Sequence, residues 1–372
     1  MKVTIGVGDC GASAKYRLWV PYIALSKACG FELFVVDSIT IKHGHVTTDG
    51  LRMADVAVFQ RVGAGDAAEW TVAAMRYLVA AGKRVVLELD DNLIHSIPKY
   101  NPASQTYGTG KHDTKLLLQA MELAERVIVS SPNLADVVRK YNENVHVAQN
   151  ALANEDFARY KRPITVGRKR NNEFRIGFAG SLSHYGDLAM IAKPVSDFVR
   201  AHADVKLVIF GGEDLLKAFP YDVRMKIEHV AAIDATQGQM AKSATYRDAI
   251  MPRYYAQLGK LDLDVAIAPL EPNSFNAARS KLKALEYGMA AFPVLASRFG
   301  PFREYMAESD CAIATSASDA EWTKMLRILY ADPEMRAELA LRNQEHVARH
   351  YLISSRLQEW KAALGVGELS AV

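Results

Sequence analysis

The sequence predicts an α/β protein made of two Rossmann-like domains that face each other across a cleft. Short β-branched runs alternate with longer helical patterns, which favours parallel strands connected by helices. The alternation stops at a polar, basic segment and then restarts. The 372 residues, half of them apolar and 23% charged, provide enough material for two domains of roughly 150 to 200 residues each.

The first half of the chain supplies the elements of the first domain, expected over residues 1–160. Its strand-like runs are "KVTIGVG", "FELFVVD", "VAVFQR", "RVVLELD", "RVIVSS" and "VHVAQN". Helical patterns lie between most of these runs, over residues 16–29, 67–81, 111–123 and 134–141. Right-handed crossovers of this kind place helices on both faces of a parallel sheet.

A linker is expected over residues 161–173, because "KRPITVGRKRNNE" contains a proline and no apolar period. The second domain is expected over residues 174–350, with strand-like runs "FRIGFAGS", "VKLVIFGG", "DVAIAPL", "FPVLAS" and "CAIATS". Its helices are expected over residues 187–202, 279–289, 320–331 and 333–351. Open α/β domains bind ligands at the carboxyl ends of their strands, so the cleft is expected to hold a two-part substrate.

Composition narrows the class of protein only partly. Lys plus Arg exceed Asp plus Glu by three, which neither demands nor excludes a polyanionic partner. Cys10, Cys29 and Cys311 lack metal-ligand spacing and fit a reduced compartment. There is no apolar run of about 18 residues and no basic leader before the first strand, so we expect a cytoplasmic protein without integral membrane contact.

The segment "IGFAGSLSHYGDL" places small and polar residues between a predicted strand and a predicted helix. Free amides at the start of a helix attract an anion such as a phosphate, and small residues let it approach the backbone. The plainer interpretation is a turn in which a side chain caps the helix. The residues concerned are Gly180, Ser181, Ser183, His184 and Asp187.

The segment "SFNAARSKLKALEYGM" places Arg279, Lys281 and Lys283 at the start of a predicted helix, with Ser280 as the expected N-cap. The helix macrodipole opposes cations at this end, so the cluster indicates a bound anion. Glu286, about one and a half turns further on, suits hydrogen bonds to ribose hydroxyls. The alternative is a solvated helix face with a Lys283–Glu286 pair.

Two motifs of the first domain complete the candidate site. "VGDCGASAKYRLW" follows the first strand with a close-approach loop at the mouth of the domain, formed by Gly11, Ser13, Lys15 and Arg17. "ELDDNLIHSIP" ends the fourth strand with an acidic pair that could hold a metal or bond sugar hydroxyls, and with a histidine suited to proton exchange. These candidate catalytic residues are Asp90, Asp91 and His95, with turn capping and a structural histidine as the alternatives.

Together these motifs resemble the GT-B-fold glycosyltransferases of the glycosyl transferases group 1 family, which retain anomeric configuration. The strongest match is "DVAIAPLEPNSFNAARSKLKALEYGMAAFPVLAS", which resembles the family's nucleotide-sugar signature. "RIGFAGSLSHYGDL" resembles its donor loop, and "VIVSSPNLADVVRKYNENVHVAQNALANEDF" resembles the end of its first domain. The resemblance covers nearly the whole chain. "ELDDNLIHSIP" and "SLSHYGDL" resemble a subset common in phage and bacterial genomes whose acceptors are unassigned.

The resemblance implies that the second domain binds a nucleotide-diphosphate sugar, a UDP-sugar in preference to a GDP-sugar, and that the first binds the acceptor. Glu286 takes the place of the second Glu of a Glu, seven residues, Glu motif, and bonds the ribose. The first Glu is replaced by Ala278, and Asn276 is among the residues expected to substitute for it. Gly211 joins the donor site. Lys281 or Lys283 neutralises the diphosphate, so no metal or other cofactor is expected.

The resemblance also implies that residues 351–372 include a helix that crosses back to the first domain. The acceptor hydroxyl is left open among a glycan, a lipid-linked sugar, a small molecule and a hydroxymethylated DNA base. If the protein is phage-encoded, its location is the host cytoplasm. Two other functions share the architecture: a nucleotide-sugar epimerase, which needs no acceptor, and a non-catalytic nucleotide-sugar binding protein.

Overall fold

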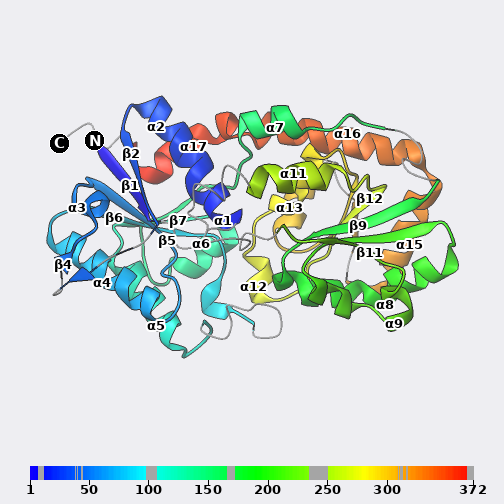
Figure 1. The fold of residues 1–372 in the computed structure, drawn as a ribbon, viewed down its shortest axis with the longest axis horizontal. Helices are drawn as coiled ribbons and strands as arrows, with labels where there is room; N and C mark the ends of the chain where they lie inside the picture. Colours follow the sequence, from blue (N-terminus) through cyan, green and yellow to red (C-terminus); the bar gives the residue numbers. More distant parts are fainter. Residues whose placement is uncertain are drawn as a thin grey trace.

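The chain forms two six-stranded parallel sheets in a computed structural model, and helices cover both faces of each sheet (Figure 1). The structure describes residues 1–6, 12–37, 39, 41–42, 45–97, 107–165, 172–233, 250–308, 310, 313–315 and 317–366. The predicted α/β class with two Rossmann-like domains is therefore confirmed. The domain boundaries near residues 160, 173 and 350 stay predictions.

The first sheet has the strand order β2-β1-β5-β6-β7-β8. Its strands are β1 (Lys2–Gly6), β2 (Glu32–Val36), β5 (Val56–Gln60), β6 (Arg84–Leu89), β7 (Arg126–Val129) and β8 (Val145–Val147). Between β2 and β5 in the chain, β3 (Ile41–Lys42) and β4 (His45–Val46) form a short antiparallel pair. The helices of this half are α1 (Ala12–Ala14), α2 (Val20–Cys29), α3 (Asp49–Arg52), α4 (Asp66–Ala80), α5 (His112–Leu123), α6 (Pro132–Val138) and α7 (Asn154–Tyr160). A π-helical stretch, Lys15–Trp19, joins α1 to α2.

The second sheet has the order β11-β10-β9-β12-β13-β14. Its strands are β9 (Phe174–Gly180), β10 (Val205–Gly211), β11 (Glu228–Ala231), β12 (Val265–Ala268), β13 (Val294–Ser297) and β14 (Ile313–Thr315). The helices are α8 (Tyr185–Ala201), α9 (Tyr221–Arg224), α11 (Met251–Gly259), α12 (Ser274–Ala277), α13 (Leu282–Met289), α14 (Pro301–Glu308), α15 (Asp319–Ala331), α16 (Pro333–His350) and α17 (Ile353–Leu364). Among the described residues, 3₁₀ turns occupy Leu93–His95, Leu182–His184 and Glu213–Ala218.

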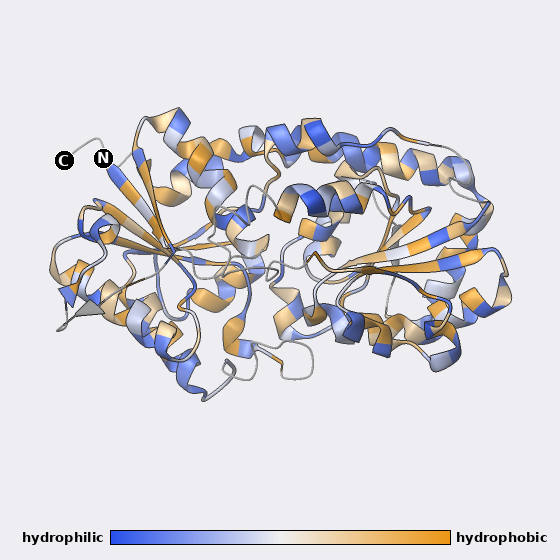
Figure 2. Cartoon of the chain, in the orientation of Figure 1, coloured by the Kyte–Doolittle hydropathy of each residue, from blue (hydrophilic) through white to orange (hydrophobic). Residues whose placement is uncertain are grey.

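Side-chain alternation along the strands builds a separate core on each face of the first sheet. Val56 and Val58 pack with α2 and α17, whereas Ala57 and Phe59 pack with α4 and α5. Successive residues of a strand point to opposite faces, so a strand with helices on both sides is apolar throughout. The strands of both sheets are accordingly mostly orange in Figure 2, while the helices around them are of mixed hydropathy.

The last two helices run along both halves of the molecule (Figure 1). α16 packs on α13 of the second half, and α17 packs on α2 and β8 of the first half. Trp360 of α17 is fully buried there, with the Arg17 guanidinium 4.6 Å from its ring centroid. No helix among the described residues is both long and apolar enough to cross a bilayer.

Side chains of each half also pack in a core of the other. Tyr16, from the first half, is 1% exposed and packs in a hydrophobic core of the second. Ala278, from the second half, is also 1% exposed and packs in a core of the first. Backbone carbonyls next to this exchange accept hydrogen bonds across the junction, from Ser131 Oγ to Ala278 O at 2.7 Å and from Asn133 Nδ2 to Ala277 O at 2.8 Å. The two halves are thus held together close to the strand ends.

Candidate active site

A cavity of about 200 Å³ lies between the two halves. The carboxyl ends of β6, β9 and β12 approach it, as expected for paired open α/β domains. The first half lines it with Ala12, Ser13, Tyr16, Asp90, Asp91 and Asn150. The second half lines it with Ser181, Ser183, His184, Leu270, Arg279, Ser280, Leu282, Lys283, Glu286 and Phe302. The cavity therefore brings together residues from most of the motifs identified in the sequence.

The second half provides a cationic wall, defined here as His184, Arg279 and Lys283. Arg279 Nη1 lies 2.7 Å from His184 Nε2, and Arg279 Nη2 donates to Ser183 Oγ at 3.0 Å. Burial, with Arg279 and Lys283 nearby, holds the pKa of His184 well below its usual value, so its imidazole is neutral. Burial also lowers the pKa of Lys283 to about 8, which leaves its ammonium charged at neutral pH. Two cations and a neutral imidazole in a confined space suit an anion.

Two glycines make this wall possible. A Cβ at Gly180 would lie 2.8 Å from Lys283 Nζ, which donates a 2.5 Å hydrogen bond to Ala179 O. A Cβ at Gly211 would lie 2.4 Å from Gly180 O on the neighbouring strand. Gly180 thus allows the lysine to approach the end of β9, and Gly211 allows the ends of β9 and β10 to pack closely. Gly211 does not line the cavity.

Asp187 and Asn276 lie behind the cationic wall and support it. Asp187 Oδ1 accepts hydrogen bonds from Asn276 Nδ2 at 2.7 Å and from the Glu271 amide at 2.9 Å. Its Oδ2 lies 2.8 Å from His184 Nδ1, so the imidazole is held between Asp187 and Arg279. Burial raises the pKa of Asp187 to about 6. Asn276 is 3% exposed and is committed to this network rather than to the cavity.

Glu286 has a tyrosine hydroxyl on each carboxylate oxygen. Tyr16 donates to Oε1 at 2.6 Å, and Tyr254 donates to Oε2 at 2.8 Å. The side chain is 6% exposed, and burial raises its pKa above the usual value in spite of these hydrogen bonds. Burial and the carboxylate also raise the pKa of both tyrosines, so each stays protonated and able to donate.

The first half provides an acidic wall, Asp90 and Asp91, which is organised by Arg61. Arg61 Nε and Nη2 lie 2.8 and 2.6 Å from Asp90 Oδ1, and Nη2 also lies 3.3 Å from Asp91 Oδ2 and 3.0 Å from Ser13 Oγ. Although burial opposes ionisation, Arg61 lowers the pKa of Asp90. Arg61 has φ = 58°, a strained backbone conformation for a non-glycine residue. Arg61 is not among the site residues predicted from the sequence, although an arginine directly after a buried strand end was a signal for it.

Several predicted site residues lie elsewhere. His95 is exposed, bonds Asn92 Oδ1 through Nδ1 at 3.1 Å, and does not line the cavity. Lys15 pairs with Asp156 at 2.7 Å, and Arg17 is buried against Glu88 at 2.9 Å. Of the predicted acceptor-side loop only Ser13 lines the cavity, and Gly11 lies outside the described residues.

The start of helix α13 differs from the predicted helix over residues 279–289. α13 begins at Leu282, and Ser280 does not cap it but accepts a 2.9 Å hydrogen bond from Asn150 Nδ2. Lys281 turns away from the cavity and donates to Glu308 Oε1 at 2.7 Å and to Tyr351 Oη at 2.9 Å. Only two of the three clustered cations, Arg279 and Lys283, therefore reach the cavity.

Among the described residues, no group of three or more His, Cys, Asp or Glu side chains is arranged to hold a metal ion. Asp90 and Asp91, which could have served as ligands, bond Arg61 instead.

No protein-family model matches the sequence, and no curated protein matches it. Solved structures do match. HepE from Anabaena, in complex with UDP and glucose, aligns with a TM-score of 0.65 at 12% identity over 98% of this chain and 99% of that chain. Sucrose-phosphate synthase from Thermosynechococcus elongatus aligns with a TM-score of 0.58 at 12% identity over 100% and 98%.

A putative UDP-N-acetylglucosamine 2-epimerase from Listeria monocytogenes aligns with a TM-score of 0.54 at 12% identity over 100% of this chain and 97% of that chain. At these identities the alignments establish the fold. The chain therefore has the two-domain GT-B fold that its motifs predicted, with the cavity at the junction of the two domains.

Proposed function

We propose that the protein is a glycosyltransferase that moves a hexose from a UDP-sugar to an acceptor hydroxyl with retention of configuration. The observation that carries the proposal is the meeting of two unlike walls in one cavity: cations from the second domain and the Asp90 and Asp91 side chains from the first both line it. The cationic wall suits an anionic leaving group, and the carboxylate wall suits an acceptor with several hydroxyls. The complexes of HepE with UDP and with UDP-glucose support the choice of donor.

In this proposal the donor diphosphate lies against Arg279 and Lys283, with the Ser181 and Ser183 hydroxyls beside it. These hydroxyls are 2.8 Å apart, and the turn that carries them leads into the 17-residue helix α8. The positive end of the helix macrodipole adds to the two cations. The Glu286 carboxylate bonds the ribose hydroxyls in place of its two tyrosines.

The transfer step forms a bond between the acceptor oxygen and the anomeric carbon while the bond from that carbon to the phosphate oxygen breaks. The bonding electron pair leaves with UDP, and the acceptor proton passes to the departing phosphate oxygen on the same face of the sugar. Arg279 and Lys283 stabilise the charge that develops on the diphosphate without need of a cofactor. Asp90 and Asp91, held by Arg61, bond acceptor hydroxyls and orient the attacking one. The sparse cysteines favour a cytoplasmic setting.

Calorimetry with UDP, GDP, ADP and their sugars tests the donor site. We expect UDP to bind, and Arg279→Met and Lys283→Met each to weaken it by about tenfold or more, since each removes a charged hydrogen bond worth about 1.5–3 kcal/mol. Lys281→Met is the matched control, because it removes a neighbouring charge that faces away. Unchanged binding in both test variants would overturn the assignment.

Product analysis tests the reaction itself. Incubation with UDP-glucose and candidate acceptors, followed by mass spectrometry and NMR of the anomeric proton, should show a new glycoside with the donor's configuration. Conversion of the UDP-sugar into its epimer without an acceptor would instead establish an epimerase. Binding of UDP-sugars without any turnover would indicate a non-catalytic binding protein.

A further inference from the structure

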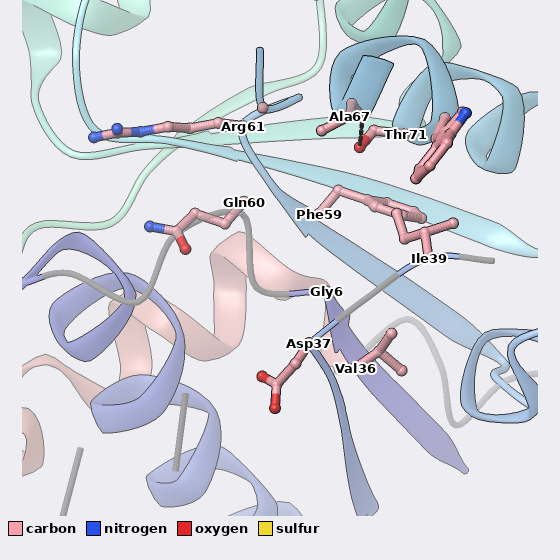
Figure 3. A pocket seen from close by; sticks show the side chains of 11 residues that line it. Gly6, Val36, Asp37, Ile39, Phe59, Gln60, Arg61, Ala67 and Thr71 are labelled. Atoms are coloured by element: carbon pink, nitrogen blue, oxygen red, sulfur yellow. Dashed lines mark hydrogen bonds between the residues drawn. The ribbon is translucent and has the colours of Figure 1, made fainter. Parts of the chain in front are cut away.

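A second cavity, of about 260 Å³, lies within the first domain at the carboxyl ends of β1, β2 and β5 (Figure 3). Gly6, Val36 and Gln60, the last residues of those strands, all line it. Its volume is below the roughly 300–1,000 Å³ of pockets for drug-sized ligands, so it fits one ring rather than an extended molecule. The mechanism proposed above does not use this cavity.

The lining of the cavity is apolar on one side and polar on the other. In Figure 3 the side chains of Val36, Ile39 and Phe59 lie on one side of the Gly6 backbone, whereas Gln60 and Arg61 extend to the other. Such a division matches a pyranose ring, which has an apolar face of C–H groups and an edge of hydroxyls.

An exposed tryptophan borders the same cavity. Trp70 of α4 is 54% exposed, whereas the other three tryptophans of the chain are at most 4% exposed. The indole combines a flat apolar face with a polar N–H. Sugar rings stack well on such faces through their C–H groups.

Gln60 provides an independent sign of a binding site. It is 2% exposed and lines the cavity, and among the residues that the structure describes neither its amide oxygen nor its amide nitrogen has a hydrogen-bond partner. A buried amide without partners is unfavourable, and such groups are rare in folded proteins. An amide offers one acceptor and two donors, which are the groups that bond sugar hydroxyls.

Arg61 connects this cavity to the one between the domains. It lines the first-domain cavity and bonds Ser13, Asp90 and Asp91, which line the interdomain cavity. A ring in the first-domain cavity with its polar edge toward Arg61 would therefore direct a hydroxyl toward the proposed donor. This places the second cavity on the acceptor side of the reaction.

The charge around the cavity argues against a nucleic acid as the acceptor. Asp37 lines the cavity, and Asp66 and Glu69 lie in the first turn of α4, beside the lining residues Ala67 and Trp70. These carboxylates repel phosphodiesters, whereas nucleic-acid sites concentrate Lys and Arg. Arg61 is paired with Asp90 and Asp91.

We propose that the first-domain cavity binds the terminal pyranose ring of a neutral carbohydrate, stacked on Trp70 and bonded by Gln60. Its role as the acceptor site rests on the proposed transferase function; its affinity for the ring does not. Of the acceptors left open by the sequence, this proposal keeps glycans and simple glycosides.

The test uses the full chain and methyl α- and β-glycopyranosides of glucose, galactose and mannose. Saturation-transfer NMR measures their binding, and acrylamide quenching measures protection of Trp70. We expect at least one glycoside to bind and to protect the tryptophan. Trp70→Ala should weaken that binding at least tenfold, and Trp70→Phe, which keeps an aromatic face, by less than threefold. Gln60→Leu, of similar shape, should weaken it at least fivefold.

The control variant is Val79→Ala, which changes an exposed residue near the other end of α4 and should alter nothing. All variants should keep their UDP affinity within twofold. The proposal is overturned if no glycoside binds, if Trp70→Ala binds as well as wild type, or if an oligonucleotide containing hydroxymethylcytosine binds at Trp70 instead. Trp70-dependent glycoside binding without any sugar transfer would support the carbohydrate site and refute the transferase function.

Discussion

The hydroxyl of Tyr16, in the first domain, donates a 2.6 Å hydrogen bond to Oε1 of Glu286, in the second domain. The same hydroxyl lies 2.7 Å from the Tyr255 hydroxyl, so two side chains of the opposite domain bond it. Glu286 is the carboxylate proposed to bond the donor ribose. Ribose would have to replace the tyrosine hydroxyls, which couples donor binding to the contact between the domains.

Removing the competing hydroxyl should strengthen donor binding. We expect Tyr16→Phe to bind UDP more tightly, by about tenfold or more, because a hydrogen bond to a carboxylate, about 1.5–3 kcal/mol, no longer has to be exchanged. Calorimetry measures the change. Tyr255→Phe is the control, since it alters the same tyrosine pair but leaves the bond from Tyr16 to Glu286. Weaker UDP binding by Tyr16→Phe would mean that the tyrosine orients the carboxylate for ribose rather than competing with it.

Glu286 should determine the recognition of ribose. Wild type is expected to prefer UDP over 2′-deoxy-UDP by about tenfold or more, since a charged hydrogen bond contributes about 1.5–3 kcal/mol. In Glu286→Ala most of this preference should disappear, together with most of the thermal stabilisation by UDP. Glu286→Gln keeps the side-chain volume, so it separates the loss of the carboxylate from a packing defect caused by the alanine. A variant that still discriminates between the two nucleotides as wild type does would show that ribose is bound elsewhere.

The lowered pKa of Lys283 predicts that donor binding depends on pH. Burial lowers the pKa of its ammonium to about 8, so the free protein loses this charge as the pH rises through that value. An anion binds the charged form better, so affinity for UDP-glucose should be full at about pH 7 and fall above about pH 8, by at most about tenfold per unit. The diphosphate of UDP-glucose does not titrate in this range. Lys283→Arg keeps its charge and should give a flat profile, whereas an equally steep one would assign the effect to another group.

Lys281 should affect stability rather than donor binding. Burial would raise the pKa of Glu308, but the neighbouring His346, Lys281 and Tyr351 side chains lower it to about 2. We expect Lys281→Met to reduce the free energy of unfolding by about 1–3 kcal/mol at pH 7 and to leave UDP affinity within about twofold of wild type. The contribution of the ionised Glu308 is present above its unfolded pKa and is lost as the pH falls toward 2, so the difference should shrink between about pH 4.5 and 2. If Lys281→Met lost UDP binding without losing stability, Lys281 would belong to the donor site.

Placing a glutamate at position 278, where the resemblance expects one, should destabilise the protein. Ala278 is 1% exposed within the first-domain core, and a charged side chain there would lack a partner. We expect Ala278→Glu to lower the free energy of unfolding by about 3–5 kcal/mol in denaturant titrations and to leave transfer no faster. Ser274→Glu, at an exposed position of α12, should cost less than about 0.5 kcal/mol. Full stability with faster transfer would show that position 278 can reach the donor sugar.

Local sequence decided the strands, the helices and the general place of the site. Runs of Val, Ile and Phe form strands where helices cover both faces of a sheet. The helices expected over 67–81 and 333–351 agree closely with α4 (Asp66–Ala80) and α16 (Pro333–His350). Strand ends in such folds face the cleft, and the sequence therefore brought Asp90, Ser183 and Glu286 into one candidate site, where the structure also places them.

Tertiary structure decided which of these side chains face the cavity. Lys281 lies just before the first residue of α13 and turns to Glu308, whereas Lys283, inside the helix, reaches the cavity. The partners of Tyr16 and Ala278 lie 270 and 147 residues away in the chain, at Glu286 and Ser131. No local pattern encodes such contacts, because they exist only once both domains have folded and closed on each other.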